Sequence, residues 1–151
     1  MNALLSIKPR YAEAILTGTK KWEFRTRRFQ RTPDKVFIYC STPVRKVVGV
    51  FETGKIISGS PGKIWKMCGK EGTISKKEFF EYFNYKIVYA IQISRAKKLD
   101  VPIELNSLGK SRPPQSFYYI DDIQNLGVKR EKFFIFNFIK KSILGLAIRR
   151  R

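Results

Sequence analysis

The chain has 151 residues, enough for one domain with a buried core, and carries 31 Lys and Arg against 12 Asp and Glu, a formal net charge of +19. A field of this strength attracts polyanions, so nucleic acid is the expected partner and an anionic membrane surface is the alternative. The chain has no His, which excludes a Ser-His-Asp triad, a Cys-His dyad and a His-based metal site.

The two cysteines, Cys40 and Cys68, have no paired spacing that would make a zinc site, and Cys40 lies within an apolar run typical of a buried thiol. We therefore expect no metal and no cofactor. The start of the chain has a short apolar run but neither a basic segment before it nor a cleavage site, so we expect a cytoplasmic protein.

The apolar run over residues 4–7 predicts a short strand, and Pro9 suits the first turn of a helix over residues 9–17. Gly18 is a natural stop for that helix. The first two elements therefore end at residue 18, directly before a strongly charged segment.

The next segment, residues 20–25, alternates as a strand does. One face would carry Lys21, Glu23 and Arg25, and the other Lys20, Trp22 and Phe24. This pattern fits either a working surface or an edge strand with solvated charges. Lys20 and Glu23 would face opposite sides unless Gly18 and Thr19 let Lys20 turn back, whereas Glu23 and Arg25 should be neighbours.

Residues 26–33 form a basic loop. Arg27, Arg28 and Arg31 could grip phosphates, and Phe29 offers a stacking face among them, as suits single-stranded nucleic acid. A solvated loop is the alternative.

The middle of the chain predicts two strands and two helices. Residues 35–41 read as a buried strand, and residues 47–51 as a strand that continues through a bend to residue 59, as closing a small barrel requires; Arg45 lies on the turn between them. Ser60 and Pro61 open a helix over 61–70.

A second helix over residues 75–84 begins with Ser75 and Glu78 as a capping box. Aromatic side chains cover most of this helix: Phe79, Phe80, Tyr82 and Phe83. Core packing is the expected role, and a base-stacking platform is the alternative.

Residues 86–94 alternate as a strand, and residues 101–105 predict a separate edge strand because Pro102 cannot donate to a ladder. A basic loop follows over residues 106–114. Residues 121–151 hold two apolar pieces interrupted by Lys140 and Lys141, which argues against a spanning helix. We expect this extension to dock on the domain, with a basic tail on a membrane surface as the alternative.

Several segments together resemble a known family. They are Ser6-Ile7-Lys8-Pro9 followed by Gly18-Thr19-Lys20-Lys21 and Glu23-Phe24-Arg25, then residues 36–43 running into 47–52, residues 75–83, and Arg112-Pro113-Pro114-Gln115-Ser116-Phe117. Their order and spacing resemble an ASCH domain, a branch of the PUA-like superfamily, over residues 1–120. The resemblance implies a small β-barrel that binds RNA or a modified nucleobase.

The predicted fold class is α+β: a five- or six-stranded, mostly antiparallel β-barrel of PUA-like type with short helices around it. The predicted function is RNA binding. The expected nucleic-acid-binding residues are Lys8, Arg10, Lys20, Lys21, Trp22, Glu23, Arg25, Arg27, Arg28, Arg31, Arg45, Arg112, Gln115, Ser116 and Tyr118. Basic side chains would hold phosphates, while Trp22 or Tyr118 stacks on a base that Glu23 or Gln115 reads.

An enzyme on the same scaffold is the alternative function. Some ASCH relatives are amidohydrolases of acetylated cytidine and others are ribonucleases. The resemblance implies Lys20 as the catalytic Lys and Glu78 as a possible catalytic Glu, but Glu23 stands where the amidohydrolases have Thr. If the protein is an enzyme, Lys20 and the Glu23 carboxylate are therefore the candidates for acid–base work. A concave pocket lined by Lys20 and Glu23 would favour a base or nucleoside site, and a flat strand would favour phosphate binding alone.

Overall fold

The computed structural model describes residues 1–121 of the chain. The expectations for the C-terminal extension therefore lie outside the described residues, apart from Asp121. No helix within this described part is long and apolar enough to cross a membrane.

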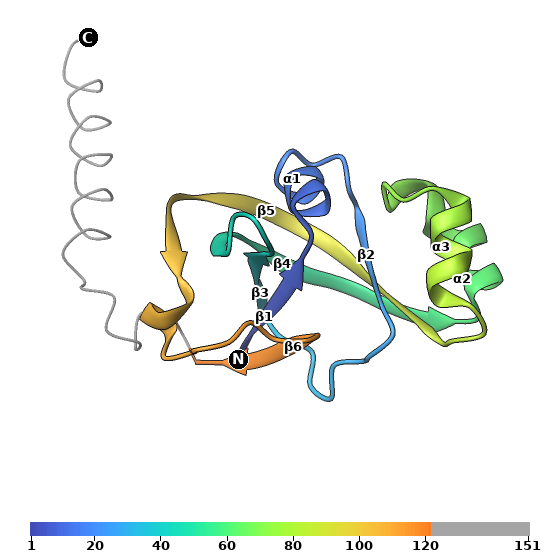
Figure 1. The fold of residues 1–151 in the computed structure, drawn as a ribbon. Helices are drawn as coiled ribbons and strands as arrows, with labels where there is room; N and C mark the ends of the chain where they lie inside the picture. The colour runs from blue at the N-terminus through green and yellow to red at the C-terminus, as the bar shows by residue number, and fades with distance from the viewer. Residues whose placement is uncertain (122–151) are drawn as a thin grey trace, which may run out of the picture.

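A single six-stranded sheet organises the fold (Figure 1). Its strands are β1 (Asn2–Ile7), β2 (Trp22–Arg25), β3 (Lys35–Cys40), β4 (Lys46–Gly59), β5 (Val88–Glu104) and β6 (Phe117–Ile120), in the order β2-β5-β4-β3-β1-β6. Only the pair β1 and β3 is parallel among these strands. The prediction of a mostly antiparallel sheet is confirmed.

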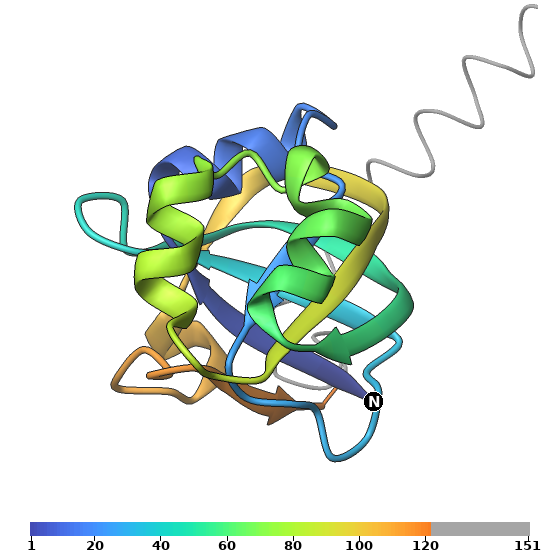
Figure 2. The ribbon, with the colours of Figure 1, turned by 90° about the vertical axis from the view of Figure 1, so that its right-hand side faces the viewer.

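Three α-helices pack beside this sheet: α1 (Pro9–Leu16), α2 (Pro61–Cys68) and α3 (Lys76–Phe83). The predicted start signals are present, because the Ser60 hydroxyl accepts from the Lys63 amide and Ser75 and Glu78 form the capping box. Helices α2 and α3 lie together at one end of the sheet, next to the C-terminal end of β4 and the N-terminal end of β5 (Figures 1 and 2).

One element differs from its prediction. Residues 86–94 and 101–105 were expected to form two strands, but β5 runs without a break from Val88 to Glu104. Pro102 is tolerated within it because β2 pairs only with Tyr89–Gln92, which leaves the second half of β5 with β4 as its one ladder partner among the described strands. Arg95, with a positive φ of 45°, lies between Ser94 and Lys97, where the register with β4 shifts.

Bending of β4 and β5 curls the sheet into a half-barrel. Their ladder contains three register shifts, and such bulges increase local twist and bend a strand. The predicted continuation of residues 47–51 through a bend to residue 59 is confirmed by β4. In the described part of the chain β2 and β6 are the two edges of the curled sheet, and a side chain of β2 spans the opening between them.

That side chain is Arg25. Its guanidinium donates to the Ser6 carbonyl at the end of β1, at 3.2 Å, and to the Ser116 carbonyl directly before β6, at 2.9 Å. Arg25 therefore links β2 to the opposite edge of the sheet by side-chain hydrogen bonds, where a closed barrel would have a backbone ladder.

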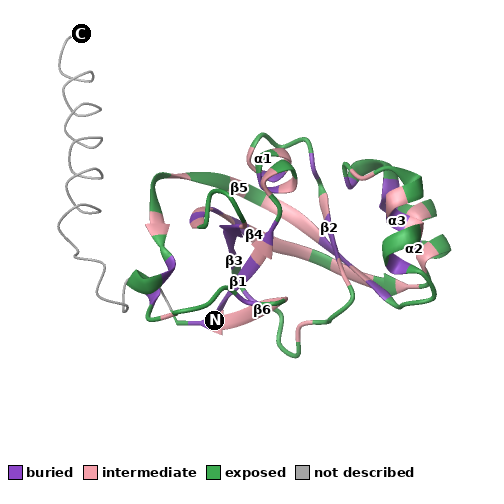
Figure 3. Cartoon of the chain, in the orientation of Figure 1, coloured by how far each residue is buried: buried purple, intermediate pink, exposed green. Residues whose placement is uncertain are grey.

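The core has a sheet part and a helical part. Figure 3 shows the buried residues concentrated on β1 and β3, and those strands supply Leu5 and Ile38 to the cluster under α1. At the other end, Phe24 of β2 packs edge-on against Phe79, with ring centroids 5.1 Å apart. Phe79 is fully buried, so the core prediction for this residue is confirmed.

Candidate functional site

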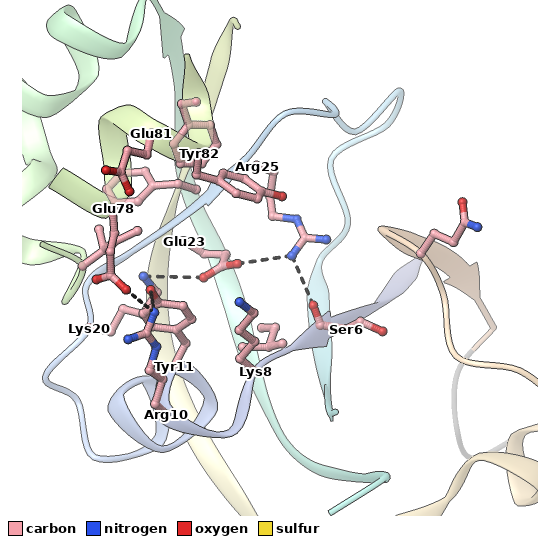
Figure 4. Close-up of a pocket in the computed structure, with 15 residues that line it drawn as sticks. Ser6, Lys8, Arg10, Tyr11, Lys20, Glu23, Arg25, Glu78, Glu81 and Tyr82 are labelled. Atoms are coloured by element: carbon pink, nitrogen blue, oxygen red, sulfur yellow. Dashed lines mark hydrogen bonds and ion pairs between the residues drawn. The ribbon is translucent and has the colours of Figure 1, made fainter. Parts of the chain in front are cut away.

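A cavity of about 520 Å³ opens between α1, β2 and α3 (Figure 4). It lies where the helical end of the molecule meets the end of β1 and the start of α1. Most of its lining is polar or aromatic: Ser6, Lys8, Arg10, Tyr11, Lys20, Glu23, Arg25, Glu78, Glu81, Tyr82 and Gln115. Four basic and three acidic side chains thus surround one hollow.

Lys20 lies at the base of this cavity and is only 2% exposed. The turn after α1 places it there, because Gly18 adopts a φ of +80° and the Lys20 amide donates to the Ala14 carbonyl at 2.9 Å. The ammonium donates to the Gly72 carbonyl. A side chain at Gly72 would collide with the Phe24 ring, so this close approach of backbone to ring requires glycine.

Glu23 is buried beside Lys20. Its carboxylate lies 3.6 Å from the Lys20 ammonium and 3.4 Å from the Arg25 guanidinium. The expected pairing of Glu23 with Arg25 is confirmed. Lys20 reaches the same carboxylate because β2 begins only at Trp22, so Lys20 lies in the turn and is free of strand alternation.

Burial shapes the acid–base properties of the cavity floor. Desolvation lowers the pKa of Lys20 below its ordinary value, and the charge of Glu23 opposes this shift. Desolvation also raises the pKa of Tyr11, whose ring lies 4.8 Å from the Lys20 ammonium. The floor therefore combines a buried cation, its carboxylate partner and a phenol.

Arg10 and Glu78 form an ion pair at the cavity mouth, joining α1 to α3 at 2.8 Å. The Arg10 hydrogen bond, followed by that of Ser75, holds the pKa of Glu78 below its usual value. Glu78 thus serves the capping box and the cavity at once. Both side chains are about half exposed, so a ligand can reach them.

The structure brings together only some of the predicted site residues. Those that line the cavity are Lys8, Arg10, Lys20, Glu23, Arg25, Glu78 and Gln115. A second cavity, of about 550 Å³, is lined by Arg27, Arg112, Gln115, Ser116 and Tyr118. The remaining candidates, which line neither cavity, are Lys21, Trp22, Arg28, Arg31 and Arg45.

Two aromatic side chains expected to stack on bases are half-buried and pack against other side chains of the protein. Trp22 is half-buried against the cluster of α2 and α3. Phe29 packs edge-on against Phe117, with centroids 4.8 Å apart, because the Tyr119 hydroxyl holds the loop by bonding the amide and carbonyl of Arg31. The loop is therefore held against β6 by the packing of Phe29 and by the hydrogen bonds of Tyr119.

Other cavity residues were missed by sequence reasoning: Ser6, Tyr11, Glu81 and Tyr82. Tyr82 was assigned to the core with its aromatic neighbours, but it is 61% exposed while Phe79 and Phe83 are buried. Helical spacing alone did not single out Tyr82, because it lies three residues from Phe79 and residues three or four apart share a helix face. Tyr11 lay in the amphipathic pattern of α1 and gave no separate signal.

The described residues contain no cluster of three or more His, Cys, Asp or Glu that could hold a metal ion. Cys40 and Cys68 are both buried and unbonded to each other. Burial raises the pKa of Cys68 to about 11, which suits a packing role.

Fold and site together define a small α+β domain, built on a half-barrel sheet, with an ionic cavity between its first helix and its helical end. The chain belongs to the ASCH domain family, whose family model matches residues 5–102. This match confirms the resemblance drawn from the sequence.

Several known proteins are similar to this chain. An "ASCH domain-containing ribonuclease" of Zymomonas mobilis is 29% identical over 124 residues, covering 79% of this chain and 84% of that protein. The crystal structure of ASCH from Zymomonas mobilis matches with a TM-score of 0.76 at 25% identity, covering 85% of this chain and 94% of that one. The ATP synthase subunit alpha of Ureaplasma parvum is 33% identical over 123 residues, but the match spans only 15% of its length.

Proposed function

We propose that this ASCH domain binds single-stranded RNA, holding phosphates on its basic surface and taking one base into the cavity above Lys20 and Glu23. The observation that carries the proposal is the cavity itself, because a concave site lined by this pair fits a base, whereas a flat strand would fit phosphates alone. The net charge of +19 supports a polyanionic ligand.

Side chains at the mouth of the cavity suit the sugar–phosphate backbone. Lys8 and Arg10 are exposed there and can contact phosphate oxygens. Such contacts release counterions, so binding should weaken as salt rises; four phosphate contacts would give a log–log slope of about −3 for a single strand.

Other side chains that line the cavity suit a base. Tyr82 presents an exposed ring to the cavity, with the Lys86 ammonium 5.4 Å from its centroid, so stacking and a positive charge come together. Glu23 can accept from an exocyclic amine, and Gln115 can both donate and accept.

The test is fluorescence anisotropy with a labelled 10-nucleotide single-stranded RNA at several salt concentrations. Tyr82→Ala should weaken binding roughly tenfold or more, because stacking of one base contributes about 1–3 kcal/mol. Tyr85→Ala is the matched control, since Tyr85 is 98% exposed, lies on the same segment and does not line the cavity. Equal losses in both variants, or a salt slope near zero, would remove the proposal.

Ribonuclease activity is a second candidate function, favoured by the printed name of the Zymomonas mobilis relative. Strand cleavage needs one group to take the proton of the attacking hydroxyl and another to protonate the leaving oxygen. Glu23 and Lys20 are the candidates, since the lowered pKa of Lys20 makes it a better acid than a free lysine. A hydrolase of acetylated nucleosides is less well supported, because Glu23 replaces the expected hydroxyl nucleophile.

Gel electrophoresis of end-labelled RNA separates binding from cleavage. A ribonuclease working through this site should lose turnover in Lys20→Met even at RNA concentrations that saturate the variant. Lys21→Met is the control, because Lys21 is exposed and does not line the cavity. Intact RNA after long incubation with the wild type would leave binding as the function of the site.

A further inference from the structure

The second cavity adjoins the first through one shared residue, Gln115. Its volume of about 550 Å³ is close to that of the first, and the loop before β6 forms most of its lining. Arg27 comes from the basic loop after β2 and Arg112 from the loop before β6, so two segments far apart in the sequence supply its cations.

The backbone on either side of Gln115 is held by hydrogen bonds. The Ser6 hydroxyl donates to the Pro114 carbonyl at 2.7 Å, and Arg25 donates to the Ser116 carbonyl at 2.9 Å. Both donors also line the first cavity. These hydrogen bonds therefore fix the two cavities relative to each other. Gln115 is exposed and lies at their junction.

Charge differs between the two cavities. The first mixes basic side chains with Glu23, Glu78 and Glu81, which suits recognition of a neutral, hydrogen-bonding base. The second has Arg27 and Arg112 as its charged lining residues and no carboxylate among the described residues that line it. Two guanidiniums without a competing carboxylate suit a phosphate group.

An aromatic residue, Tyr118, lines the second cavity together with the two arginines. The Tyr118 hydroxyl contacts the carbonyls of Arg112 and Pro113, at 3.3 Å each, and thereby holds the loop that carries Arg112. The Lys110 ammonium lies 5.4 Å from the centroid of the Tyr118 ring. The second cavity therefore offers cations and a stacking ring, the combination that single-stranded nucleic acids use.

We propose that the second cavity is a subsite for the neighbouring nucleotide of the same RNA strand. The phosphate joining the two nucleotides lies near Arg27 and Arg112, and Gln115 contacts the strand where it passes from one cavity to the other. This inference rests on the proposed RNA binding and deepens it, because it makes the ligand a strand of at least two nucleotides and not a free nucleoside.

The experiment compares nucleoside 5′-monophosphates, dinucleotides and the 10-nucleotide RNA by calorimetry and anisotropy. In the wild type, dinucleotides should bind at least tenfold more tightly than monophosphates. The double variant Arg27→Glu/Arg112→Glu should reduce that gain to less than threefold. Both arginines are exposed, so folding should be retained, and Arg27→Gln/Arg112→Gln gives the same test with a smaller charge change.

The control is Lys63→Glu/Lys66→Glu, which changes the net charge equally at two exposed positions of α2, a helix that lines neither cavity. A similar loss of dinucleotide affinity in the control and in the arginine variants would overturn the subsite. If Tyr82→Ala still weakens binding of the 10-nucleotide RNA in that case, the proposed function stands without the second subsite. Failure of the wild type to bind any RNA would overturn both.

Discussion

Replacement of Arg25 by Ala tests whether this side chain closes the half-barrel. The guanidinium reaches from β2 to the Ser6 carbonyl at 3.2 Å and the Ser116 carbonyl at 2.9 Å, and it also contacts Glu23 at 3.4 Å. The variant would remove all of these contacts and leave the sheet edges without this link. It would also take one of two cations away from a buried carboxylate.

The expected loss of stability is about 3 kcal/mol. Hydrogen bonds to a charged group contribute about 1.5–3 kcal/mol each, but the two carbonyls lie at an edge that water can reach after the substitution. Breaking a buried ion pair costs about 3–5 kcal/mol, and Lys20 remains 3.6 Å from the carboxylate to limit that cost. Since a 5–15 kcal/mol stability is usual for domains, the variant should still fold.

Urea denaturation followed by circular dichroism measures this loss. With an m-value of about 2 kcal/mol/M, the midpoint should fall by about 1.5 M. Arg28→Ala, in the exposed loop, should change stability by no more than about 0.5 kcal/mol. Hydrogen exchange should quicken in β6 before it does in β3. A midpoint for Arg25→Ala equal to that of Arg28→Ala would refute the closing role.

Three further predictions concern the core and the cavity floor. Phe79→Ala should lower the unfolding free energy by about 3–5 kcal/mol in the same urea assay, because the ring is fully buried; an unchanged melting temperature would contradict its core role. The pKa of Lys20 is lower in the folded protein than its ordinary value of 10.5, so at a pH between these two values the unfolded chain binds more protons than the folded one. The stability of the wild type should therefore rise with pH relative to that of Lys20→Met. A stability difference that does not depend on pH would count against burial of the charge. Glu23→Gln should change base preference in a panel of homopolymer RNAs while leaving the salt slope unaltered, and an unchanged preference would make Glu23 purely structural.

Local chemistry made much of the fold predictable. The capping box of Ser75 and Glu78, the Ser60 cap and the proline at the start of α1 mark the helix starts within a residue of those observed. The strand predicted to end at residue 94 instead continues through Pro102 as β5, because its ladder with β4 resumes after bulges. Register shifts depend on a distant partner strand, and the sequence of one strand does not contain them.

The cavity was less predictable than the strand beside it. Alternation in β2 correctly placed Glu23 next to Arg25, because both lie inside the strand. This alternation did not show that Lys20 lies before the strand and meets Glu23. The helical pattern of α3 likewise did not show that Tyr82 lies outside the core. The positions of Lys20 and Tyr82 depend on how the turn after α1 and the helix α3 pack against the sheet. This packing consists of contacts between segments that are distant in the sequence.

Hydrogen-bonding capacity on the cavity floor favours recognition of a ligand over purely structural pairing. A carboxylate has about four acceptor positions, and Glu23 meets two cations, Lys20 and Arg25. An ammonium has three donors, of which Lys20 directs one to the Gly72 carbonyl and one toward Glu23. Capacity therefore remains on both groups, and both line a cavity reached by solvent. A buried ion pair of this kind is costly to desolvate and contributes little stability by itself, so the remaining hydrogen-bonding capacity at the floor of the cavity supports the proposed contact with a base.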